Sequence, residues 1–140
     1  VSTSTTRTDL LLFSGCAKVE GGSGFFYSAL MFASTDAATN PNFDLFLFDT
    51  PNITLAADNA ASAVADSEIT GCVGVITFDG TTAANAHTAG ANLVIDVPSI
   101  GHGFKCQPNS KDLYGLVIDR GGYTPASAEV YTFKLVIVQD

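Results

Sequence analysis

Few residues of this chain have the types and spacing that metal binding requires. His87 and His102 stand fifteen positions apart, and neither belongs to a cluster of cysteines and histidines at the spacing of zinc ligands. Asp58, Asp66 and Glu68 flank one long loop, where carboxylates and backbone carbonyls could surround a calcium ion. Solvated loop carboxylates explain these three acids more simply. We therefore predict no metal site and no cofactor.

Nucleophilic and acid–base catalysis have no stronger support. A serine nucleophile often stands on a G-x-S-x-G elbow, but the stretch 21–25 around Ser23 lacks the last glycine. With 14 acidic residues, some pair can always be imagined as the acid and base of a sugar hydrolase, so the acids single out no site. The sequence also lacks a phosphate-binding glycine motif. We predict no catalytic residues and expect that the chain is not an enzyme.

The cysteines favour a reduced protein. Cys16, Cys72 and Cys106 are odd in number and widely spaced, inside stretches that otherwise resemble strands. This pattern favours buried free thiols over one disulfide with a leftover cysteine. Free thiols in turn indicate folding in a reducing compartment.

Charge and hydropathy exclude two classes of partner. The net charge is −8, and the six basic residues are scattered along the chain. Phosphate backbones are bound by clustered cations, so we expect no nucleic-acid partner. No apolar run approaches the roughly 18–20 residues of a membrane span, and the first residues lack the pattern of a signal peptide. We therefore expect no membrane partner either.

The elements that must position any site are β-strands. Eight segments rich in β-branched and aromatic residues are bounded by Gly, Pro, Asn, Asp or Ser. They cover residues 8–13, 24–32, 43–48, 69–78, 93–97, 103–106, 113–119 and 130–138. They predict an all-β fold, an antiparallel and jelly-roll-like β-sandwich of about eight strands with at most one or two short helical turns. We expect a polar N-terminal arm at residues 1–7 and a single domain at residues 8–140.

The apolar pattern indicates how these strands face. In the last strand the expected core positions alternate with Thr132 and Lys134, which face water. These core positions are Tyr131, Phe133, Leu135 and Ile137. By contrast, residues 43–48 and 73–78 are apolar on both faces, which is typical of central strands or of strands whose outer face meets a partner.

Two stretches predict little regular structure. Asp58 could cap a helical turn through the alanine-rich residues 59–65, although so short a helix needs packing to be stable. Residues 79–92 hold almost no bulky apolar side chain and predict an exposed loop.

The segment 113–129 contains the most distinctive loop. Gly121 and Gly122 permit a positive φ, while Pro125 fixes its own φ and favours an extended Thr124. The simplest interpretation is a structural hairpin whose Tyr123 caps the core. As a contact loop, it would present an arginine and a tyrosine, two residue types enriched at interface anchors. The candidate interface residues are therefore Arg120, Gly121, Gly122, Tyr123, Thr124 and Pro125, together with Phe46 and Phe48 from the doubly apolar strand.

The pattern L-Y-G-L-V-x-x-R-G-x-Y-T-P-A-S-x-E-x-Y-T-F at residues 113–133 resembles the ending of a group of small virion proteins of tailed bacteriophages. The resemblance extends to residues 42–48, 58–61 and 71–78, and it departs from the pattern at Asp119 and Gly122. It implies a head decoration (cement) protein, made in the cytoplasm of the bacterial host and placed on the capsid exterior of the virion. The implied partners are the major capsid protein and further copies of the chain, as a homotrimer. The alternative is a jelly-roll carbohydrate- or receptor-binding module of a phage tail or fibre.

Overall fold

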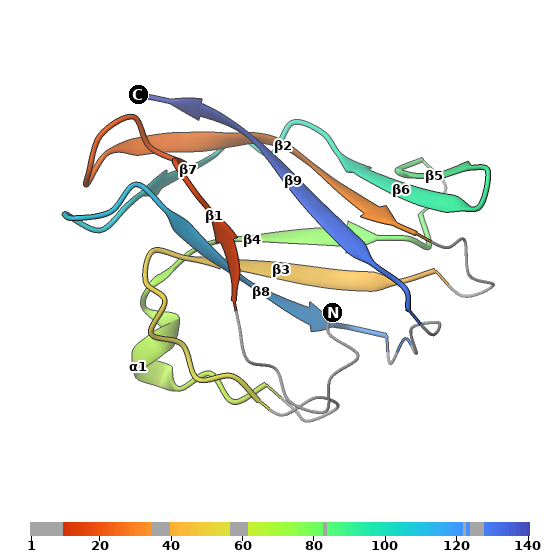
Figure 1. Cartoon of the computed structure of the whole chain (residues 1–140), viewed down its shortest axis with the longest axis horizontal. Coiled ribbons are helices and arrows are strands. Elements are labelled where there is room, and N and C mark those ends of the chain that lie inside the picture. Colours follow the sequence, from red (N-terminus) through yellow and green to blue (C-terminus); the bar gives the residue numbers. More distant parts are fainter. Residues whose placement is uncertain (1–9, 35–39, 57–61, 83, 122, 124–127) are drawn as a thin grey trace.

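The computed structural model describes residues 10–34, 40–56, 62–82, 84–121, 123 and 128–140, and these form two antiparallel sheets packed face to face (Figure 1). The four-stranded sheet has the order β1-β8-β3-β4, and the five-stranded sheet has the order β5-β6-β2-β7 with β9 also paired to β2. The predicted all-β sandwich is confirmed. The predicted N-terminal arm at residues 1–7 lies outside the described residues.

The strands and the one described helix have the following bounds. They are β1 (Leu11–Phe13), β2 (Ser23–Ala33), β3 (Asn42–Phe48), α1 (Asp66–Ile69), β4 (Cys72–Asp79), β5 (Ala86–Ala89), β6 (Asn92–Val97), β7 (His102–Lys105), β8 (Leu113–Asp119) and β9 (Tyr131–Gln139). Among these elements, no helix is long and apolar enough to cross a lipid bilayer.

The chain passes repeatedly from one sheet to the other. It does so between β1 and β2, β2 and β3, β4 and β5, β7 and β8, and β8 and β9. Crossing connections of this kind are typical of Greek-key and jelly-roll sandwiches. As a result, each sheet includes strand pairs that are distant in sequence, such as β1 with β8 and β2 with β9.

The core fills the space between the sheets because side chains alternate along each strand. β2 contributes Phe26, Ala29 and Met31, all completely buried. Aromatic rings join the two layers: Phe78 of β4 meets Phe133 of β9 edge to face, with ring centroids 5.3 Å apart. Such a pair adds about 0.5–1.5 kcal/mol beyond the burial of its area.

A second, smaller cluster lies on the outer face of the four-stranded sheet. Phe48, Ile53 and Leu116 are its buried members. The connection from β3 to β4, which contains α1, runs beside this sheet in Figure 1 and contributes Ile53. Glu68 holds the connection together by accepting hydrogen bonds from the Thr54 hydroxyl at 2.6 Å and from the Ala65 amide at 2.8 Å.

Two sequence-based expectations were wrong in detail. The strand expected at 69–78 begins only at Cys72, because Ile69 belongs to α1. The helical turn expected over 59–65 is not helical at residues 62–65; residues 57–61 lie outside the described part, and the helix begins at Asp66.

The stretch 79–92, expected as a loop, contains β5. This strand pairs antiparallel with β6 from Ala86 opposite Ile95 to Ala89 opposite Asn92. Gly90 opens the two-residue turn between them with a φ of 68°, which suits the short turns of β-hairpins.

Candidate functional site

The loop after β8 carries the chain from the four-stranded to the five-stranded sheet, so the predicted hairpin is wrong. The predicted capping role of Tyr123 is nevertheless confirmed. Its ring packs edge to face against Phe43 and Tyr131, at centroid distances of 6.1 and 6.4 Å. Its hydroxyl donates a hydrogen bond to Oε2 of the buried Glu129 at 2.7 Å.

Tyr123, Tyr131 and Glu129 form this cap, and burial raises the pKa values of its two tyrosines. Desolvation raises the pKa of Tyr123, and the neighbouring Glu129 raises it further. The pKa of Tyr131 is raised for the same first reason, with contributions from Tyr123 and Glu129. Both phenols therefore stay neutral at physiological pH, and Tyr123 serves as the donor to Glu129. The cap is a structural element and not a ready contact surface.

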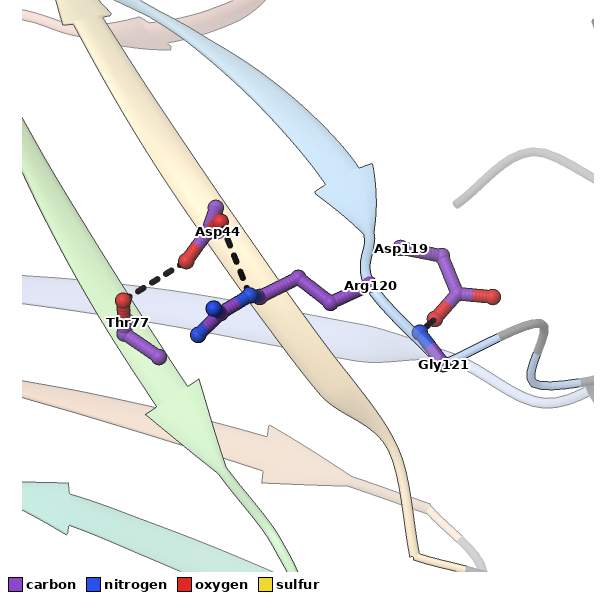
Figure 2. A network of polar contacts seen from close by, with 5 residues as sticks. All are labelled: Asp44, Thr77, Asp119, Arg120 and Gly121. Carbon is purple, nitrogen blue, oxygen red and sulfur yellow. Dashed lines mark hydrogen bonds and ion pairs between the residues drawn. The ribbon is translucent and has the colours of Figure 1, made fainter. Parts of the chain in front are cut away.

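A polar network lies on the outer face of the four-stranded sheet (Figure 2). Asp44 of β3 accepts a hydrogen bond from the Thr77 hydroxyl of β4 at 2.6 Å. Its other oxygen, Oδ2, lies 3.3 Å from Nε of Arg120. The Gly121 amide donates to Oδ1 of Asp119 at 2.9 Å. Asp44 thus joins β3 to β4 and to the residue that follows β8.

Arg120 is half exposed, so its ion pair with Asp44 adds little to stability. The pairing through Nε fixes the direction of the side chain. Arg120 is therefore a preoriented cation that can meet a carboxylate or carbonyl of a partner, at a lower entropic cost than a free side chain.

Two further candidate interface residues, Phe46 and Phe48, belong to the smaller cluster or pack against it. Phe48 has an exposed fraction of 0%, and Phe46 packs against the cluster around it. The chain's own β3–β4 connection covers this part of the doubly apolar strand, and β3 is a central strand between β8 and β4, which agrees with the first of the two alternatives. Gly122, Thr124 and Pro125 lie outside the described residues. In the second doubly apolar stretch, Val75 remains 48% exposed.

The structure reveals an apolar surface that sequence reasoning missed, which we call the β2–β9 face. On β2 its members alternate with the buried Phe26, Ala29 and Met31, and on β9 they alternate with core-facing residues. Its members are Phe25, Tyr27, Leu30, Phe32, Val136 and Val138.

Exposure differs across the β2–β9 face. Val136 and Val138 are each 44% exposed, and Tyr27, at a bulge of β2, is 55% exposed. The ammonium group of Lys134 lies 5.0 Å from the centroid of the Phe32 ring, as in a cation–π contact. The sequence signal was present, since residues 23–33 read SGFFYSALMFA and are apolar on both faces.

The cysteines are free, as predicted. Cys16 and Cys106 are buried, whereas Cys72 is only partly so. Burial raises the pKa of Cys16 to about 11, and its Sγ donates to the carbonyl of Phe13 at 3.1 Å. A thiol in this state is a poor nucleophile, because the thiolate is the reactive form.

The side chains considered as metal ligands do not lie close together in the described part of the chain. Within the described residues, no three His, Cys, Asp or Glu side chains cluster in a way that could hold an ion. Glu68 is engaged by Thr54 and Ala65, and Asp58 lies outside the described part. His102 donates from Nε2 to the carbonyl of Val73, 3.0 Å away, and its ring stacks against Phe26.

Comparisons with protein-family models, with curated proteins and with solved structures found no match to this chain.

Proposed function

We propose that this chain acts by binding and not by catalysis, as a decoration protein on the outer surface of a tailed-bacteriophage head. The observation that carries the proposal is the β2–β9 face. It places Tyr27, Val136 and Val138 in solvent, beside the partly buried aromatic rings of β2. Contiguous exposed apolar surface on a folded domain usually marks an interaction site.

The second support is the resemblance of residues 113–133 to small phage virion proteins. This resemblance implies that the partner is the major capsid protein and that the chain lies on the virion exterior. Arg120 lies within this motif and offers a preoriented cation at the opposite sheet. The net charge of −8 favours docking on a basic patch of the shell.

Such binding would stabilise the shell by mass action. A ligand that binds the assembled head but not its separated subunits shifts the equilibrium toward the assembled state. Many identical shell sites multiply this effect, because one patch serves every copy.

A binding assay on purified empty heads tests this proposal. We expect the chain to cosediment with heads and to raise the temperature at which they open. The double variant Tyr27→Ser/Val138→Ser should lose at least about tenfold in affinity, since burying each side chain is worth roughly 1–3 kcal/mol. The matched control is Val19→Ser/Val75→Ser, which removes two exposed apolar side chains outside the face. Wild-type protein that stays in the supernatant would refute the proposal.

The exposed ring of Tyr27 favours one second candidate, a carbohydrate- or receptor-binding module of the virion. Exposed aromatic rings can stack on sugars, whereas Tyr123 is engaged in the core cap. Micromolar binding on a glycan array, lost in Tyr27→Ala, would support this candidate. Head binding together with no detectable binding on the glycan array would eliminate this candidate.

A further inference from the structure

The strand β9 forms a long edge of the five-stranded sheet. Its nine residues pair along their length with β2, and no strand among the described residues pairs with its other side. An edge of this kind presents a row of free backbone donors and acceptors. β9 contains no proline and no glycine, and Lys134 is its one charged residue.

The other edges of the described sheets are short or covered. β1 has three residues and β5 has four. β4 has eight, but its core-facing Ile76 and Phe78 are buried, and it lies against β6 and β7 of the other sheet. The ring of His102, from β7, also hydrogen-bonds the carbonyl of Val73. These edges offer little room for a further strand.

β9 is different because its side chains keep solvent exposure on both faces. The core-facing residues are only partly buried; they are Tyr131, Phe133, Leu135 and Ile137. On the outer face, Val136 and Val138 are exposed. An additional strand beside β9 would cover the remaining apolar surface on both sides at once.

We propose that the strand beside β9 is the β9 of a second copy, paired antiparallel about a two-fold axis. The register that uses all nine residues places Leu135 opposite itself and Tyr131 opposite Gln139 of the second copy. Lys134 then faces Val136 of the second copy, and its aliphatic stem covers that valine. The Lys134 ammonium groups of the two copies are not directly opposite each other, so this register avoids a like-charge pair.

This pairing joins the two five-stranded sheets into one continuous sheet and makes the two β2–β9 faces contiguous. It goes beyond the proposed function, because it concerns association in solution without heads. A strand pairing about a two-fold axis closes as a dimer, whereas the resemblance to phage proteins implies a trimer. The mass in solution, twice or three times 14.5 kDa, distinguishes them.

Charge substitutions at Val136 test both the surface and the register. Val136→Lys places an ammonium opposite Lys134 of the second copy twice per dimer, whereas Val136→Glu places a carboxylate there. By sedimentation equilibrium, we expect Val136→Lys to raise the dimer dissociation constant by roughly two- to thirtyfold and Val136→Glu to lower it by a similar factor. The reversed double variant Lys134→Glu/Val136→Lys should again form the dimer. Val75→Lys, with the same change at a similarly exposed site of the other sheet, should leave it unchanged.

Hydrogen exchange supplies a readout that a change in stability alone would not move. Alternate amides of β9 should exchange more slowly as wild-type concentration rises, and this concentration dependence should be weaker in Val136→Lys. A monomer at all concentrations, a trimer, or equal effects of the two charges at Val136 would each overturn the inference. If the chain binds heads as a monomer, the proposed function stands and the dimer inference fails. If the chain forms the dimer but does not bind heads, the inference stands and the proposed function fails.

Discussion

Glu129 is a buried carboxylate in the loop that joins β8 to β9. A buried acid is costly unless donors replace the water that it loses. The Tyr123 hydroxyl, 2.7 Å from Oε2, is one such donor. Sequence reasoning predicted that Tyr123 caps the core, but it gave no indication that Glu129 accepts its hydrogen bond, because that contact depends on how the loop turns.

Removing this donor should destabilise the fold. Tyr123→Phe keeps the ring packing but leaves the Glu129 carboxylate with one hydrogen bond fewer, at a cost of about 1–3 kcal/mol. The exposed Tyr27 provides the matched control, and Tyr27→Phe should change the free energy of unfolding by less than about 0.5 kcal/mol. Urea denaturation measures both. Equal stability of the two variants would show that the cap contributes nothing through this bond.

At the scale of elements, local pattern and turn chemistry decide most of the structure. β8 has the predicted bounds because turn-forming residues flank a short apolar run, and the predicted alternation of β9 is confirmed. β5 was missed because Ala-His-Thr-Ala has no bulky side chain and depends on its pairing with β6. The first residue of its turn, Gly90, was the available signal.

The turn after β4 should make stability depend on acid pH. Hydrogen bonds from the Thr81 and Thr82 side chains, and then from the Thr81 amide, lower the pKa of Asp79 from 3.8 to about 2. Since the folded-state pKa is the lower one, this carboxylate stabilises the fold above about pH 4, and the contribution is lost as the pH falls toward about 2.

Thr81→Ala removes one donor, so the pKa of Asp79 should move back toward 3.8 and the loss of stability between about pH 4 and 2 should become smaller. Thr81→Ser keeps the hydroxyl and should behave like the wild type. Urea midpoints measured across this pH range compare the variants. An unchanged acid slope in Thr81→Ala would mean that the turn does not hold the carboxylate.

At the scale of the whole molecule, the two sheets have different outer faces. Phe48 is covered by the β3–β4 connection, while the β2–β9 face carries exposed apolar side chains. Sequence identified strands that are apolar on both faces, but it could not tell which outer face the chain itself would cover. That outcome depends on the path of a long connection, which no local pattern encodes.

The charge distribution gives a prediction for assembly. Arg120 follows the end of β8 and is held by Asp44, whereas Lys111 precedes the start of the same strand. Arg120→Glu puts a carboxylate beside Asp44 and should weaken head binding by roughly three- to tenfold, with a stability loss within about 1 kcal/mol. Lys111→Glu makes the same change in net charge and should bind nearly as the wild type does. Equal occupancy of the two variants on heads would contradict the assignment of Arg120.

The β3–β4 connection, clasped by Glu68 over one side of the sandwich, also limits how large an aggregate can become. If the outer faces of both sheets exposed apolar side chains, each added molecule would present a new apolar binding surface, and stacking could continue as a fibre. Because the connection covers Phe48 and buries its own Ile53, an attached molecule offers less apolar surface on its four-stranded sheet than on its β2–β9 face, so continued stacking is less favourable.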